Sequence, residues 1–372
     1  LAEKVRMATI PGVKVVNITY ESGKYVKELD GWRGISIFFV ALLHYFPSYL
    51  IGGWIGMELI FVVSGFLITG ILLDSKSGKN YYKRFITRRI LRIFPLYYLC
   101  LFGLFFLLPN SWLDLSYYKT HQAWFWLYAE NWLFSIQGWP DVKALRHFWS
   151  LAIEEQVEIT WPLVVWLFSK QGLIRFCVFL FFFSFLFRNI GMHMGFVMPF
   201  PYVATLGRME PIVLGALIAI LVRTNKSILE RNVYPVTIIS GVLAVIIFLI
   251  AGGMNMEIPL IYMVNYTVLD IFFAGIIVLT ICKDELVYFK RRVLNPPFFK
   301  QLGLMSYCIY IFHRPIQVIV QTNFFEYFYT QTGNENAGKL ICVIISILIT
   351  IPVVYLIHKT VELPIWNLKR YI

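Results

Sequence analysis

The chain has 372 residues, of which 59% are hydrophobic, 18% aromatic and 15% charged, and its mean hydropathy is +0.69. A soluble domain carries roughly 25% charged residues, so this composition excludes one. Apolar runs of about 20 residues predict a helical membrane protein that crosses the bilayer several times. Basic loops on one side of a membrane explain the net charge of +12, and we expect no nucleic-acid partner. The five scattered cysteines lack a C-x-x-C pair and indicate packing rather than disulfides or a metal site.

Residues 1–28 are polar and charged, so we expect a cytoplasmic N-terminal extension without a cleavable signal peptide. Membrane-spanning helices are then predicted over ten ranges: 32–50, 54–73, 93–108, 148–168, 173–188, 205–222, 233–251, 259–281, 302–321 and 339–358. An eleventh apolar stretch, 121–136, is short and contains Glu130 and Asn131.

Loop charge orients these helices. The segment 74–92 is rich in lysine and arginine, which places it in the cytoplasm, and the segments 223–231, 283–292 and 359–370 are also basic. All four lie on one side only if 121–136 does not cross, so we predict a re-entrant or interfacial helix there. The expected fold is an all-α membrane bundle of about ten transmembrane helices with both termini in the cytoplasm.

The first predicted helix carries two costly residues, Arg33 and His44, eleven positions apart. Eleven steps of about 100° place them roughly 20° apart on one face and about 16 Å apart along the axis. Ionisable groups in hydrocarbon usually mark a site or pathway. Snorkelling of Arg33 and a hydrogen-bonded core role for His44 are the alternatives. Their shared face favours anion binding at the surface and proton chemistry deeper in the membrane.

Further polar residues lie in the next predicted helices. Arg88, Arg89 and Arg92 fall within four positions, where they can share a helix surface and bind phosphates bidentately. Ordinary anchoring at the cytoplasmic surface is the alternative. Glu58 is an intramembrane carboxylate, and the small pair Ser64-Gly65 indicates a close approach of two helices.

The run HFWSLAIEEQVEITWP is the richest in acids. His147, Ser150 and Glu154 fall on one helix face, Glu155 points elsewhere, and Glu158 returns to the face of Glu154. A Ser-His-Glu hydrolase triad is conceivable on this spacing, but a carboxylate that binds an intramembrane arginine is the stronger interpretation. Later in the chain, Arg208 lies close to Glu210, and Ser306, Tyr310 and His313 share one face.

Five segments, in order across residues 29–372, resemble the bacterial acyltransferase-3 family of membrane-bound acyltransferases. The segments are LDGWRGISIFFVALLH, GMELIFVVSGFLITG, RRILRIFPLYY, HFWSLAIEEQVEITWPL and LGLMSYCIYIFHRPI. Glu58, Glu158 and Arg314 depart from the family pattern, which commonly has aspartate at the first of these positions and an aromatic residue at the other two.

The resemblance implies a ten-helix enzyme of the bacterial cytoplasmic (inner) membrane. Such an enzyme moves an acyl group, usually acetyl, from cytoplasmic acetyl-CoA to a hydroxyl of a cell-surface glycan such as lipopolysaccharide O-antigen or exopolysaccharide. By position, it assigns Arg33 and His44 as the first-helix pair, Arg89 and Arg92 as the arginine motif, and Glu154 or Glu155 as the working acid. Supporting or substrate-binding roles are expected for Ser64, Trp149, Ser150, Arg208, Tyr310 and His313.

The expected mechanism joins these residues. Arg89 and Arg92, with Arg88 and Arg33, hold the phosphates of the acyl-CoA, and the pantetheine arm follows the first helix to His44. His44 acts as general base or as transient acyl carrier, and both roles need a neutral ring. Glu154, Glu155, Arg208 or Arg33 is expected as its partner, and Tyr310 and His313 are candidates for oxyanion stabilisation. The sequence ends at Ile372 without the extracytoplasmic esterase-like domain that some members of the family carry, so transfer to a glycan or lipid-linked sugar is expected at the membrane domain itself.

Two other functions fit part of the pattern. A transporter of an anionic or acylated solute accounts for the buried charges but not for the joint match to the arginine and histidine motifs. An acyltransferase for a small molecule, such as an antibiotic sugar, accounts for both motifs, and no residue in the sequence distinguishes it from a glycan acyltransferase.

Overall fold

The computed structural model describes residues 19–20, 24–196 and 198–371. The long helices are α1 (Lys27–Tyr45), α2 (Ile55–Ser75), α3 (Tyr81–Phe102), α7 (Trp149–Leu167), α8 (Lys170–His193), α10 (Met209–Thr224), α11 (Lys226–Ile250), α12 (Tyr266–Cys282), α15 (Ser306–Thr332) and α16 (Glu335–Ile357). The shorter ones are α4 (Ser116–Thr120), α5 (Gln122–Trp126), α6 (Glu130–Gln137), α9 (Phe200–Val203), α13 (Val287–Phe289), α14 (Pro297–Leu304) and α17 (Leu363–Asn367). Each predicted range therefore contains a long helix, and the all-α fold is confirmed.

Among the described residues, seven helical segments are long and apolar enough to cross a membrane. They contain α2, α3, α8, α10, α11, α12 and α16. The predicted count of ten spans is therefore confirmed only in part, because α1, α7 and α15 are more polar. Their polar residues are nevertheless shielded by protein, as Glu155 on α7 is 3% exposed and His313 on α15 is 0% exposed. Intramembrane charges commonly face the interior of a bundle in this way.

The stretch 121–136 forms two short helices instead of the single helix that the sequence predicted. α5 and α6 have 5 and 8 residues, whereas a helix needs about 20 to cross a bilayer. Tyr128 separates them because its φ of 52° lies in the left-handed region, which ends a right-handed helix. Neither helix is long enough to cross a bilayer, as the sequence predicted for this stretch.

Glycines allow the central helices to approach closely. A Cβ atom on Gly65 of α2 would collide with the carbonyl oxygen of Ile212 on α10, and one on Gly215 of α10 would collide with that of Val62 on α2. In the same way, Gly34 of α1 lies against Phe299 of α14. The predicted close approach at Ser64-Gly65 is confirmed, and it leaves the Ser64 side chain beside the interface of α2 with α7.

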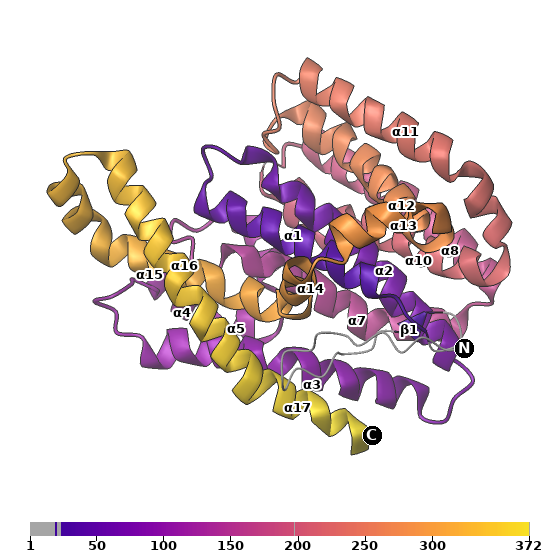
Figure 1. Ribbon diagram of the computed structural model, residues 1–372, viewed down its shortest axis with the longest axis horizontal. Coiled ribbons are helices and arrows are strands. Elements are labelled where there is room, and N and C mark those ends of the chain that lie inside the picture. Colours follow the sequence, from indigo (N-terminus) through magenta and orange to yellow (C-terminus); the bar gives the residue numbers. More distant parts are fainter. Residues whose placement is uncertain (1–18, 21–23, 197, 372) are drawn as a thin grey trace.

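The outer helices present apolar side chains to their surroundings. On α8 Phe179 is 59% exposed, and on α11 Ile238 is 62% exposed, as expected for lipid-facing surfaces. Figure 1 shows α11 at one edge of the bundle and the α15–α16 hairpin at another, with α1 and α2 between them.

The two ends of the chain differ in what the structure describes. β1 (Thr19–Tyr20) and β2 (Lys24–Tyr25) pair antiparallel, and residues 1–18 and 21–23 of the expected N-terminal extension lie outside the described residues. α17 packs against α3, so the C-terminal segment lies on the side of the basic segment 74–92. That this side is cytoplasmic stays a prediction.

Candidate active site

A cavity of about 100 Å³ opens among α1, α2, α3, α7 and α15, and we call it the arginine chamber. Arg33, Arg89 and Arg92 bring three guanidinium groups to its wall, and Glu154, Glu155 and Glu158 bring three carboxyl groups. The expectation that Glu155 points elsewhere is therefore wrong. Arg88 does not line this cavity, and its side chain is exposed, so the three arginines of the motif do not share one surface.

Hydrogen bonds and an ion pair hold several side chains of the arginine chamber in place. Arg89 Nη1 lies 2.9 Å from Glu158 Oε1, and Arg33 Nη2 donates to Ser306 Oγ at 3.1 Å. Ser64 Oγ donates to Glu154 Oε1 at 2.8 Å. The interpretation of a carboxylate bound to an intramembrane arginine thus applies to Glu158 and not to Glu154.

Arg92 is placed differently from Arg89. Its guanidinium carbon lies 5.8 Å from the ring centroid of Trp366 in α17, and no carboxylate of the described residues lies within ion-pair distance of it. A desolvated arginine with an aromatic neighbour and no carboxylate is suited to bind an anionic group from outside the chain.

A second cavity, of about 370 Å³, lies at the other end of α1, and we call it the histidine chamber. Helix ends and connections build it, and its lining includes His44, Lys143, Arg146, His147 and Arg314. Aromatic side chains of Trp139, Trp149 and Tyr202 complete the wall. Arg33 and His44, which share one face of α1 as predicted, therefore serve two different cavities.

The ring of His44 is held by His313. His44 Nδ1 lies 2.7 Å from His313 Nε2, and His313 Nδ1 lies 2.8 Å and 2.9 Å from the carbonyl oxygens of Ile309 and Tyr310. Carbonyls only accept, so His313 Nδ1 carries the hydrogen, and a neutral His313 ring then accepts at Nε2. His44 therefore donates from Nδ1, which leaves the lone pair of its Nε2 for chemistry.

His313 occupies the place that the sequence assigned to an acid or an arginine. Glu154 and Glu155 line the arginine chamber, and Arg33 bonds Ser306. The carbonyl oxygen of His44 accepts from Arg314 Nη1 at 2.9 Å and from Gln317 Nε2 at 2.8 Å. These donors satisfy a carbonyl at the end of α1 that has no partner within the helix, and the sequence did not single out Gln317.

Met57 and Tyr310 line both cavities and form the partition between them. The Tyr310 hydroxyl donates to the His147 carbonyl at 2.8 Å and lies 2.6 Å from Ser150 Oγ. Ser150 thus bonds a tyrosine, and neither ring nitrogen of His147 makes a hydrogen bond of ordinary geometry with the described residues. The hydrolase triad of Ser150, His147 and Glu154 is therefore wrong.

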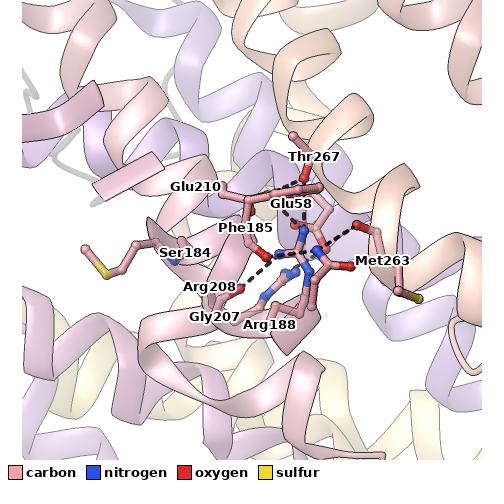
Figure 2. A network of polar contacts seen from close by, with 11 residues as sticks. Glu58, Ser184, Phe185, Arg188, Gly207, Arg208, Glu210, Met263 and Thr267 are labelled. Atoms are coloured by element: carbon pink, nitrogen blue, oxygen red, sulfur yellow. Dashed lines mark hydrogen bonds and ion pairs between the residues drawn. The ribbon is translucent and has the colours of Figure 1, made fainter. Parts of the chain in front are cut away.

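Figure 2 shows a network of polar contacts around Arg188 and Arg208. Arg208 Nη2 lies 2.6 Å from Glu58 Oε1, and both side chains are 0% exposed. Beside them, Arg188 Nη2 donates to Glu210 Oε2 at 3.1 Å and to Thr267 Oγ1 at 2.9 Å.

Arg208 contacts the chamber only through aromatic rings. Its guanidinium carbon lies 5.3 Å from the ring centroid of Tyr202 and 6.0 Å from that of Trp149. Arg208 therefore positions two wall residues and is not the partner of His44. Sequence reasoning paired Arg208 with Glu210 by proximity in the chain, whereas its partner Glu58 lies 150 positions away.

The family model described as an acyltransferase domain, acyltransferase-3, matches residues 26–359. The peptidoglycan O-acetyltransferase OatA of Listeria monocytogenes is 28% identical over 80% of this chain and 50% of its own length. The O-acetyltransferase OatA of Staphylococcus aureus is 26% identical over 92% of this chain and 58% of its own length.

The chain thus spans between half and three-fifths of the length of these two relatives. No solved structure matches it. Because the family model covers nearly the whole chain, from before Arg33 to beyond His313, the chain belongs to the acyltransferase-3 family.

Proposed function

We propose that the protein moves an acetyl group from acetyl-CoA, bound in the arginine chamber, to a hydroxyl of an envelope glycan in the histidine chamber. The observation that carries this proposal is that two polar cavities approach from opposite ends of α1 and meet at Met57 and Tyr310. The basic segment 74–92 favours a cytoplasmic opening for the arginine chamber.

The arginine chamber fits the narrow end of such a donor. Drug-sized ligands occupy pockets of roughly 300–1,000 Å³, so a cavity of about 100 Å³ admits the thioester arm and not the nucleotide. Arg89 and Arg92 then bind phosphate groups near the mouth, which the exposed Arg88 adjoins. No metal takes part in this proposal.

The histidine chamber supplies the base. His44 Nε2 removes the proton of the acceptor hydroxyl, the hydroxyl oxygen attacks the acetyl carbonyl carbon, the carbon–sulfur bond breaks, and the coenzyme A thiolate takes up a proton. In the second version, His44 Nε2 attacks the acetyl carbonyl carbon and the carbon–sulfur bond breaks, which releases coenzyme A. The acceptor hydroxyl then attacks the acetyl carbon, the carbon–nitrogen bond breaks, and the hydroxyl proton passes to His44 Nε2. In both versions His313 accepts from His44 Nδ1 and holds the ring in place.

The acceptor that we propose differs from the one expected from the sequence, because of the names of the relatives. Lipopolysaccharide O-antigen and exopolysaccharide were expected from the sequence, whereas the Listeria relative is named for peptidoglycan. We therefore place peptidoglycan, or a lipid-linked precursor of a glycan, first among the acceptors. The inner membrane of a bacterium is the proposed location.

The test is transfer of radiolabelled acetyl from acetyl-CoA to a peptidoglycan fragment by the full chain in lipid nanodiscs. Wild type should label the fragment, and His44→Ala should reduce labelling by at least about 10²-fold. Arg231→Ala is the matched control, because Arg231 is an exposed residue of α11 far from both chambers in sequence. Normal labelling by His44→Ala would contradict the assignment, and a transporter would give no covalent label in any variant.

A further inference from the structure

The histidine chamber carries an excess of positive charge. Lys143, Arg146 and Arg314 line it, and the exposed Glu257 is the carboxylate in the same lining. None of the three cations has a carboxylate within ion-pair distance among the described residues. Three cations that converge without a counter-ion from the described chain favour a negatively charged ligand.

The chain itself orients Arg146 for such a ligand. Arg146 Nε donates to the Pro140 carbonyl at 2.6 Å and Nη2 donates to the Asp141 carbonyl at 3.3 Å. The guanidinium carbon also lies 5.9 Å from the ring centroid of Trp139. These contacts fix the plane of the guanidinium and leave Nη1 without a partner among the described residues, so one edge is available to an anion.

His147 is a second and independent sign of a ligand. Its side chain is 3% exposed, neither ring nitrogen makes a hydrogen bond of ordinary geometry with the described residues, and the backbone of Tyr310 and Ile311 lies close to the ring. Its ring centroid lies 5.9 Å from that of His44 and 5.2 Å from that of His313. Buried polar atoms are nearly always hydrogen-bonded, so an imidazole with only such poorly aligned backbone neighbours in a chamber wall favours a further partner from outside the chain.

The remaining wall suits a sugar. Trp139, Trp149 and Tyr202 place aromatic surface beside the cations and His44, and ligand pockets combine such surface with a few fixed polar groups. We propose that the histidine chamber is the acceptor subsite for an anionic saccharide. Lys143 and Arg146 bind its carboxylate or phosphate, and His147 bonds a hydroxyl near the one that His44 acts on. This inference rests on the proposed function and names its substrate class.

The test compares pairs of acceptors, one anionic and one neutral, on the same sugar. The full chain in nanodiscs is given radiolabelled acetyl-CoA with N-acetylmuramic acid or with its methyl ester, and the KM of each acceptor is measured. A second pair, N-acetylglucosamine 1-phosphate and N-acetylglucosamine, replaces the carboxylate by a phosphate. We expect a KM about tenfold lower for at least one anionic partner, because a charged hydrogen bond contributes that much.

Variants assign the effect to the chamber. Lys143 is exposed, so Lys143→Glu should fold normally, raise the KM of the anionic acceptor and leave that of the neutral one unchanged. Lys119→Glu is the matched control, because it makes the same change of charge. Lys119 belongs to α4 in the same connection between α3 and α7, its Nζ donates to Asn110 Oδ1, and it does not line the chamber.

The outcomes separate the two proposals. Equal KM values within both acceptor pairs, with transfer still occurring, would overturn the anionic subsite and leave the acetyltransferase standing. An equal response of Lys143→Glu and Lys119→Glu would also overturn it, because the effect would then be one of general surface charge. Absence of transfer to every acceptor by the wild type would contradict the proposed function and the subsite with it.

Discussion

His44 Nδ1 on α1 lies 2.7 Å from His313 Nε2 on α15, although the two residues are 269 positions apart in the chain. Two backbone carbonyls on α15 fix the hydrogen of His313 on Nδ1, and that hydrogen decides which nitrogen of His44 is basic. The backbone of α15 thus determines which ring nitrogen of His44 keeps a free lone pair.

Removal of His313 should therefore harm the reaction without harming donor binding. In His313→Ala the His44 ring loses its acceptor and its orientation, so we expect kcat to fall by about 10²-fold with the KM for acetyl-CoA unchanged. In His313→Gln the amide oxygen can accept from His44 Nδ1, and part of the rate should return. Equal rates for the two variants would contradict the positioning role.

The route of the acetyl group can be tested without an acceptor. If His44 Nε2 carries the acetyl group, labelled coenzyme A should exchange into acetyl-CoA in the absence of any sugar, and His44→Ala should abolish the exchange. If His44 acts only as a base, exchange should be absent although full transfer proceeds. Isotope exchange followed by chromatography distinguishes these two versions.

Arg89 should contribute to stability as well as to binding. Arg89→Ala leaves the buried Glu158 carboxylate without its ion-pair partner. Loss of one partner of a buried ion pair lowers the free energy of unfolding by about 3–5 kcal/mol. The double variant Arg89→Ala/Glu158→Gln should recover much of this stability but still bind acetyl-CoA weakly. Thermal unfolding in detergent and the KM for acetyl-CoA separate the two effects, and Arg92→Ala should change mainly the KM.

Arg208 should behave as a structural residue. Both members of the Arg208–Glu58 pair are 0% exposed, so Arg208→Met should lower the free energy of unfolding by about 3–5 kcal/mol. Adding Glu58→Gln removes the unpaired charge and should restore part of the loss. If Arg208→Met kept its thermal stability and lost only acetyl transfer, a direct role in the reaction would replace the structural one.

The contact of α2 with α10 should be intolerant of a single methyl group. Gly65→Ala places a Cβ atom on the carbonyl of Ile212, and such overpacking costs about 1–3 kcal/mol. Gly103→Ala is the matched control, because a Cβ atom there meets nothing within 4 Å. We expect the first variant to unfold at a lower temperature and the second to match the wild type.

The sequence predicted the helices better than the site. Hydropathy located each long helix, since apolar runs are local, and the period of α1 placed Arg33 and His44 on one face. The sequence predicted one continuous polar face along α1, whereas the structure has two separate cavities. Met57 of α2 and Tyr310 of α15 separate them, and the sequence of α1 does not show that these side chains come together there.

Other parts of the site depended on partners distant in the chain. Arg208 pairs with Glu58 and His44 with His313 across 150 and 269 positions, and no local pattern encodes such pairs. In the sequence, His147 attracted notice only because it lies close to Ser150 in an acidic run. That pattern suggested a catalytic triad, which the structure does not contain.

The partition at Met57 and Tyr310 has a consequence for the cell that makes this protein. A cell that stores energy as a membrane potential cannot keep a continuous watery path across its membrane, since each charge that leaks dissipates the stored gradient. Between the two chambers lie a thioether and a tyrosine whose hydroxyl already bonds the His147 carbonyl and Ser150. If an acetyl group is what passes between them, as we propose, it is neutral and its passage would draw no current.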